Sequence, residues 1–369
     1  MNEIRSLLQA LPFFGRLTPS QLEEGATVWS TVSLKPGEVL WSEGEAAAGL
    51  AVVVAGGVSV SVGGVEVARL GEQALLGESS AFFAGVSHTT TIRAVEPAVL
   101  LVLSQSALMV FKARRTEERA TLDGLAAWDR QGRAPVYTIL LEQALQSSTR
   151  RVRSGMSELT HPAAMGKMCP SRERVGVISR LWRASKLGLP NTQSPPLAPM
   201  MRLLPPLGGE SETVLTALTR LWKPEKFERG HIFFLEGDPS DSAYLLVEGA
   251  VGEMACQSVG KAVQLRTLEP GGLFGDNGLI EQDSRTFSCI ASKPGWAYRV
   301  EPESFRRFRA SSELGILWTE TLLIHCIAKL RLVNLCHTSA EVLGGTNEDL
   351  DHGQVDFSSL LIRPGRVSI

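Results

Sequence analysis

The chain is poor in the residues that build catalytic and metal centres. Its 369 residues include only five cysteines and six histidines. No Cys-x-x-Cys, His-x-His or His-x-x-x-His pair occurs, so the sequence predicts no metal centre. A P-loop and a Gly-x-Ser-x-Gly motif are also missing. We therefore predict a protein that is not an enzyme and holds no cofactor, with reduced thiols typical of a cytoplasmic location.

The chain also has no large excess of either positive or negative charge. The chain has 37 Lys and Arg against 39 Asp and Glu, for a net charge of −2. Such a balance creates no basic field for nucleic acid or for an anionic membrane. The first residues, MNEIRSLLQALPFF, do not have the order of regions that marks a signal peptide. We expect no nucleic-acid partner and no secretion signal.

One apolar stretch, 49–68, is about as long as a membrane span. It contains five glycines, with valines at alternating positions between them. Glycine turns between alternating β-branched residues are typical of short strands. We therefore predict strands here and no membrane span.

The strongest positive feature is an internal repeat. Residues 7–58 align without a gap on residues 200–251, at an offset of 193 positions. After a short insertion the match resumes at an offset of 197, where Thr89 meets Thr286 and Phe111 meets Phe308. A long repeat that is present only twice predicts two copies of one domain. They are called copy one (1–158) and copy two (200–338) below.

Each copy has the same order of expected elements. A short helix, 17–29 or 210–222, precedes short strands that are separated by Gly, Pro and Asp. Such spacing predicts a mainly β fold, and we expect two β jelly rolls in tandem with flanking helices. The closing helices are expected at 105–119, 136–153, 303–308 and 313–334.

The segments outside the repeat are short. Residues 159–199 form the expected linker, with a short basic helix at 171–183 followed by a proline-rich spacer. Residues 339–369 form a polar tail that we expect to be partly mobile.

Several motifs follow one another in a fixed order: Pro36-Gly37-Glu38 in copy one, a Glu-Gly turn, a glycine after a valine-rich strand, and a Phe/Leu-Gly-(Glu/Asp) loop before the closing helices. In this order they resemble the cyclic nucleotide-binding domain, which is shared by CRP/FNR regulators, kinase regulatory subunits and gated channels. The resemblance implies a regulatory or sensor function, with cyclic AMP or cyclic GMP as the expected ligand.

In that family, backbone N–H groups of a short helix and an arginine bind the cyclic phosphate, and a carboxylate accepts from the ribose. Copy two matches this cassette, although Asp276 replaces a Glu, and Phe287 is large enough to intrude on the nucleotide. The resemblance assigns ligand binding to Phe274, Gly275, Asp276, Asn277, Gly278, Arg285 and Thr286.

Copy one departs further from the cassette. Its loop has one extra residue, and His88 stands where the arginine belongs. A neutral imidazole does not make a permanently charged, forked contact. We expect a degenerate pocket formed by Gly77, Glu78, Ser79, His88 and Thr89. Another anion, or a pH-dependent contact through His88, is the alternative for this pocket.

Three functions remain open from the sequence. The first is a sensor that binds its ligand in copy two, and the second is a scaffold or dimerisation protein with vestigial pockets. The third is a CRP/FNR-like transcription regulator whose reduced DNA-binding element is the arginine-rich segment 171–183. The linker is short for a complete winged helix, and Pro170 interrupts the expected partner helix.

The closing helix 313–334 carries a wide apolar stripe with helical spacing. The stripe is wider than one β-barrel edge needs. We therefore expect a protein partner or a homodimer through the closing helices, or a pairing of the two repeats within one chain.

Overall fold

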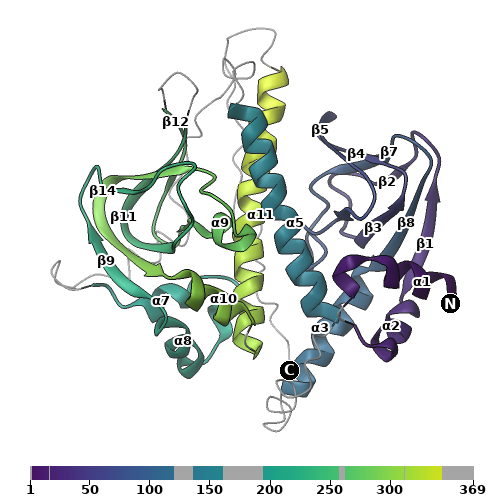
Figure 1. Ribbon diagram of the computed structural model, residues 1–369, viewed down its shortest axis with the longest axis horizontal. Coiled ribbons are helices and arrows are strands. Elements are labelled where there is room, and N and C mark those ends of the chain that lie inside the picture. Colours follow the sequence, from purple (N-terminus) through teal and green to yellow (C-terminus); the bar gives the residue numbers. More distant parts are fainter. Residues whose placement is uncertain are drawn as a thin grey trace. The chain divides into compact units, whose positions relative to one another are not determined.

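A computed structural model describes residues 2–15, 17–119, 136–160, 194–256, 262–310 and 312–342 (Figure 1). The chain divides into two compact units at Ser148 and Thr149. This boundary lies inside helix α5 (Val136–Thr160), so both units contain part of that helix. The basic segment 171–183, most of the linker and the tail from residue 343 lie outside the described residues.

Copy one consists of two four-stranded antiparallel sheets, in the orders β1-β8-β3-β6 and β2-β7-β4-β5. Its strands are β1 (Trp29–Leu34), β2 (Val39–Trp41), β3 (Gly49–Ala55), β4 (Val58–Val62), β5 (Val65–Leu70), β6 (Leu75–Leu76), β7 (Thr91–Ala94) and β8 (Ala98–Ser104). Its helices are α1 (Asn2–Ala10), η1 (Pro12–Phe14), α2 (Pro19–Ala26), α3 (Gln105–Arg119) and the first part of α5. The buried side chains of the two sheets meet in one apolar cluster that includes Trp41, Val53, Val58, Ile92 and Leu100.

Copy two has fewer strands than copy one, and two of them are long. Strand β11 (Ala243–Cys256) pairs with β14 (Ser288–Val300) at the centre of a six-stranded sheet. The other strands are β9 (Lys223–Phe227), β10 (Ile232–Phe234), β12 (Ala262–Leu268) and β13 (Leu273–Phe274). The helices are α7 (Leu197–Arg202), η3 (Leu207–Gly209), α8 (Glu212–Thr219), α9 (Asp276–Glu281), α10 (Pro302–Ala310) and α11 (Ser312–Val342).

A glycine bends the strand at the same repeat position in both copies. Gly56 has φ +80° and Gly249 has φ +90°, both in the left-handed region that disfavours other residues. A Cβ atom would lie 2.1 Å from the Pro97 carbonyl oxygen in copy one and 2.6 Å from that of Pro294 in copy two. The bend therefore requires glycine, and it redirects the chain between the two layers of each jelly roll.

The expected fold, two mainly β jelly rolls with flanking helices, is confirmed. The apolar stretch 49–68 forms β3, β4 and part of β5, as its glycines predicted. Across the described ranges, no helix has both the length and the apolar character needed to span a membrane. The expected closing helices correspond to α3, α5, α10 and α11, of which α5 and α11 run further than predicted.

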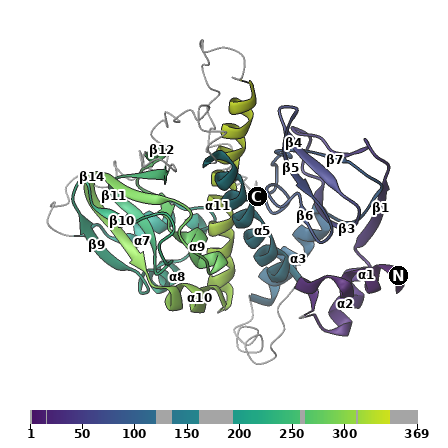
Figure 2. The ribbon, with the colours of Figure 1, turned by 45° about the horizontal axis from the view of Figure 1, so that its top comes forward.

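The last residues of α5 pack along α11, as both ribbon views show (Figures 1 and 2). The Thr149 hydroxyl lies 3.5 Å from the Cys326 thiol, and the Gly155 carbonyl oxygen lies 3.0 Å from His337 Nε2. A Cβ atom on Gly155 would come within 2.5 Å of Val333. The missing side chain thus lets the two helices approach closely. Much of the apolar stripe on α11 is buried, including Ile316, Trp318, Leu322, Leu323, Ile327 and Val333.

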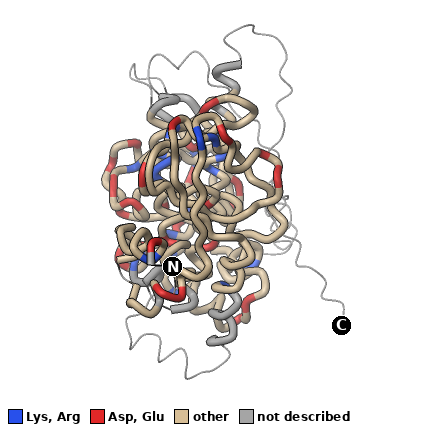
Figure 3. The backbone as a smooth tube through the Cα atoms, turned by 90° about the vertical axis from the view of Figure 1, so that its right-hand side faces the viewer, with Lys and Arg blue, Asp and Glu red and all other residues tan. Residues whose placement is uncertain are grey.

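Lys and Arg positions are interspersed with Asp and Glu positions along the coloured part of the backbone (Figure 3). This interspersion agrees with the net charge of −2.

Candidate ligand-binding site

The candidate site in copy two is built around the short helix α9. Gly275 precedes the helix with φ +76°, and Gln282 ends it with φ +57°. An added Cβ on Gly275 would lie 2.7 Å from an Arg285 nitrogen and 3.0 Å from the Ser242 carbonyl oxygen. Glycine is therefore needed at this point both for the backbone conformation and for the close approach of the Arg285 side chain.

Arg285 is 2% exposed and its guanidinium is held from several sides. Nη1 donates to the carbonyl oxygens of Ser242, at 2.5 Å, and Gly275, at 3.0 Å. Nη2 donates to Asp241 Oδ1 at 2.8 Å and to the Ser242 hydroxyl at 2.9 Å. The plane of the group covers Phe234, with Cζ 3.9 Å from the ring centroid. Arg285 is therefore an integral part of the packed structure of copy two.

Burial and charge act against each other in this cluster. Burial lowers the pKa of Arg285, and the neighbouring Asp241 carboxylate opposes that change. Partial burial favours the neutral form of Asp241, but the Ser242 hydroxyl and then Arg285 outweigh it and lower the pKa of the carboxyl. The pair therefore remains ionised at neutral pH.

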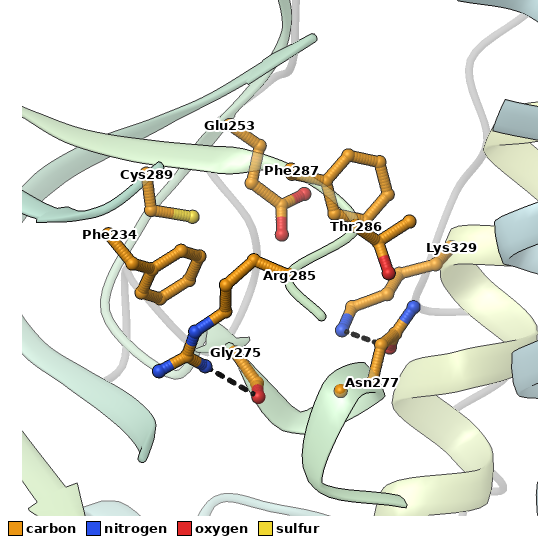
Figure 4. Close-up of a pocket in the computed structure, with 10 residues that line it drawn as sticks. Phe234, Glu253, Gly275, Asn277, Arg285, Thr286, Phe287, Cys289 and Lys329 are labelled. Atoms are coloured by element: carbon orange, nitrogen blue, oxygen red, sulfur yellow. Dashed lines mark hydrogen bonds between the residues drawn. The ribbon is translucent and has the colours of Figure 1, made fainter. Parts of the chain in front are cut away.

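A small cavity lies between Arg285 and α11 (Figure 4). Its volume of about 10 Å³ is the space for about one water molecule. The lining residues are Phe234, Glu253, Gly275, Asn277, Gly278, Arg285, Thr286, Phe287, Cys289 and Lys329. A nucleotide is far larger than this cavity, so its entry requires Phe287 or a neighbouring group to move.

Several buried polar atoms at this cavity have no hydrogen-bond partner among the described residues. They are Asn277 Nδ2, Arg285 Nε and Thr286 Oγ1 on the lining residues, and Asp276 Oδ2 beside them. Buried polar atoms without partners are uncommon, because each one costs about 1–3 kcal/mol. Two donors and a hydroxyl on lining residues are thus available to a polar ligand.

The carboxylate expected at the ribose lies next to this cavity without lining it. Asp276 is fully buried and ion-paired with Lys329 of α11, whose ammonium also donates to Asn277 Oδ1 at 3.1 Å. Lys329 was not anticipated from the sequence. A lone lysine within the apolar stripe of α11 was the available signal, because a buried lysine needs a partner.

A second buried ion pair, Glu253 with Arg266, joins β11 to β12 at the cavity wall. It was also missed, because neither residue belongs to the cassette motif. The remaining expected residue, Phe274, lies in the core and stacks on Tyr244 with 5.1 Å between the ring centroids.

In copy one, His88 occupies the position that Arg285 has in copy two. Nε2 accepts from the Ala48 backbone N–H at 2.9 Å, so the proton is on Nδ1, which lies 3.2 Å from the Ser80 hydroxyl. The imidazole stacks on Trp41, with 4.5 Å between ring centroids and 11° between planes. Burial lowers the pKa of His88, which Glu45 only partly opposes, so the ring is neutral.

The other expected residues of the copy one pocket are buried or paired within the domain. The hydroxyl groups of Ser79 and Thr89 are 2.8 Å apart, and Glu78 is 1% exposed. Gly77 has φ +78°, and a Cβ there would meet the Gly49 carbonyl oxygen at 2.4 Å. Copy one thus satisfies internally the positions that copy two leaves with unpartnered atoms.

A family model described as the cyclic nucleotide-binding domain matches residues 31–115 and 224–312. The chain contains two domains of this family. One of these domains lies in copy one and the other in copy two, and the candidate site belongs to the second. No group of three or more His, Cys, Asp or Glu in the described part of either domain is arranged to hold a metal ion.

The chain is similar to curated relatives over one domain's length. The CRP-like cAMP-activated global transcriptional regulator of Mycobacterium tuberculosis is 28% identical over 102 residues, which are 28% of this chain and 46% of the relative. The cGMP-dependent protein kinase, isozyme 1, of Drosophila melanogaster is 30% identical over 110 residues, 29% of this chain and 14% of the kinase. The chain spans less than half the length of either relative.

One solved structure that matches is the regulatory domain of Toxoplasma gondii PKA with cAMP. It is 16% identical, and the alignment covers 86% of this chain and 95% of that chain with a TM-score of 0.29.

Proposed function

We propose that the protein is a non-enzymatic sensor that binds a cyclic nucleotide in its second cyclic nucleotide-binding domain. The first domain is a degenerate copy that retains the fold without the site. The proposal is supported above all by the contrast between the unpartnered atoms around Arg285 and the satisfied hydrogen bonds around His88.

The unpartnered atoms match the chemistry of a phosphorylated sugar. Arg285 Nε and Asn277 Nδ2 are donors for phosphate oxygens, and Asp276 Oδ2 is an acceptor for a hydroxyl. The Asp241 side chain is 71% exposed, so a phosphate can compete with its carboxylate for the Arg285 guanidinium. A charge-assisted contact of this kind contributes about 1.5–3 kcal/mol.

Ligand entry would also change the surroundings of α11. The closed cavity is lined by Lys329 of that helix and by Phe287. A nucleotide that opens the cavity must therefore bind better to a rearranged state than to the closed one. This differential affinity is what a sensor needs to transmit a signal.

Calorimetric titration of the full chain with cyclic AMP, cyclic GMP and cyclic dinucleotides tests the proposal. We expect one binding event per chain with one of these ligands. Absence of binding at millimolar concentrations would refute the sensor function.

The scaffold function is the second candidate, and the small size of the cavity favours it. A volume of about 10 Å³ and the position of Phe287 describe a site that is filled by its own side chains. In that case the chain binds none of these nucleotides, and its partners bind elsewhere. A homodimer and a cytoplasmic location remain predictions, as does the DNA-binding alternative, whose segment 171–183 lies outside the described residues.

A further inference from the structure

The loop that carries Arg285 into the site is held from outside the β-barrel of copy two. Arg153, on α5, forms an ion pair with Glu281, the last residue of α9. Its Nη2 also donates to the Ser284 carbonyl oxygen at 2.8 Å, one residue before Arg285. One guanidinium therefore joins the end of α9 to the residue that precedes the phosphate-binding arginine.

This loop has a conformation that needs support. Gln282 has φ +57°, which is unfavourable for a residue with a Cβ. The corresponding loop of copy one, which is one residue longer, has a glycine with positive φ, Gly85 at +73°. Copy one thus uses the residue that tolerates this conformation, whereas copy two holds a glutamine in it. Strained residues persist where neighbouring contacts determine the conformation. Arg153 supplies three such contacts: the ion pair with Glu281, a second ion pair with Asp283 at 3.7 Å, and the hydrogen bond to the Ser284 carbonyl oxygen.

The helix that presents Arg153 is itself firmly packed. Val152 is fully buried, Met156 is 4% exposed, and Gly155 allows the close approach to Val333 of α11. The Arg153 side chain is 25% exposed and Glu281 is 8% exposed, so the ion pair is largely shielded from solvent. Shielding strengthens the pair relative to a surface salt bridge.

We propose that Arg153 is a positioning residue for the ligand site of copy two. It fixes the loop 282–285 and thereby places Arg285 and Thr286 against the cavity. The site is then incomplete without the C-terminal part of α5, a helix that begins at Val136. This proposal rests on the proposed function, because it concerns the affinity of the same site for a cyclic nucleotide.

The sign of the effect separates positioning from simple electrostatics. Glu281→Gln removes a negative charge near the site, so charge alone predicts tighter binding of an anionic ligand. Arg153→Gln removes a positive charge, so charge alone predicts weaker binding. If the ion pair positions the loop, both substitutions weaken binding.

The test titrates cyclic AMP and cyclic GMP into the full-length wild type and the variants. We expect Arg153→Gln and Glu281→Gln each to weaken binding about tenfold, and the double variant to be no weaker than either. Arg153→Lys should recover part of the affinity, since it keeps the charge but loses the fork. The matched control is Arg150→Gln, because Arg150 is an exposed arginine on the same helix, and this control should bind like the wild type.

Hydrogen exchange of the loop amides gives a readout that needs no ligand. We expect the amides of 283–286 to exchange faster in Arg153→Gln than in Arg150→Gln or the wild type, with the strand amides of β11 unchanged. Unchanged exchange of the loop amides in Arg153→Gln overturns the positioning role, whether or not the wild type binds a nucleotide. Absence of nucleotide binding by the wild type refutes the sensor function and leaves the exchange test of the positioning role intact. Faster loop exchange with unaltered nucleotide affinity also overturns the positioning role.

Discussion

The guanidinium of Arg285 lies over the ring of Phe234, with Cζ 3.9 Å from the ring centroid. The repeat alignment puts His88 at the position of Arg285 and Trp41 at the position of Phe234, and these two rings are stacked as well. Each copy thus keeps an aromatic platform and a flat nitrogen-bearing group above it. Only in copy two is that group permanently charged, so only copy two offers a cationic contact to a phosphate.

Replacing Arg285 tests this difference between the copies. Arg285→Lys keeps a positive charge but loses the forked donors, so we expect cyclic nucleotide affinity to fall about 10- to 150-fold, which corresponds to about 1.5–3 kcal/mol. His88→Ala in copy one should change affinity little, and calorimetric titration measures both. An equal loss in the two variants would mean that the site lies elsewhere.

The buried neutral state of His88 predicts an acid-sensitive copy one. Burial lowers the pKa of His88 below its ordinary value of 6.5, so the unfolded chain takes up the proton first as the pH falls. The stability contribution is therefore complete above about pH 6.5 and is lost as the pH falls from there towards the folded pKa. Its slope is at most about 1.4 kcal/mol per pH unit.

Urea unfolding at pH 7.5 and pH 5.5, followed by tryptophan fluorescence, measures this effect. Wild type should lose more stability on acidification than His88→Gln. His231→Gln is the control, because it removes a histidine of copy two whose side chain is 38% exposed. The same acid sensitivity in wild type and His88→Gln would show that other groups carry it.

Two helical glycines should respond to alanine with opposite signs. A Cβ on Gly25 of α2 has its nearest neighbour, Leu8, at 3.8 Å, so Gly25→Ala should stabilise by about 0.5–1 kcal/mol through helix propensity. A Cβ on Gly155 would meet Val333 at 2.5 Å, and overpacking of this kind costs about 1–3 kcal/mol. Thermal unfolding of both variants checks the signs, and a stabilising Gly155→Ala would show that α5 and α11 separate easily.

Much of the fold follows from local patterns that the sequence displays. The repeat predicted the second jelly roll from the first, and helix α3 begins and ends as expected, because capping and periodicity act over a few residues. The repeat alignment also pairs Gly56 with Gly249, and both have positive φ in the structure.

The contacts around the site were harder to predict, because they join distant parts of the chain. Lys329 pairs with Asp276 across 53 positions, and Arg153 pairs with Glu281 across 128. No local spacing encodes such pairs, since they depend on how α5 and α11 pack against the barrel. The cassette motif placed Asn277, Arg285 and Thr286 at one cavity, but it did not predict that the cavity would hold only about one water molecule.

Phe287 decides between the sensor and the scaffold. Its side chain lines the closed cavity and is 7% exposed, whereas the repeat alignment places Thr90 at this position in copy one. Phe287→Thr would enlarge the cavity beside the unpartnered atoms of Asn277 and Thr286. Loss of a buried ring costs about 3–5 kcal/mol, so we expect a lower thermal midpoint for copy two. A sensor whose closed state excludes its ligand should nevertheless bind the nucleotide more tightly after this change, because less energy is needed to open the site.

Phe287→Leu, which retains most of the bulk, should bind like the wild type. Weaker binding by Phe287→Thr would instead identify Phe287 as a contact of the bound ligand, and no binding by any of the three proteins would favour the scaffold.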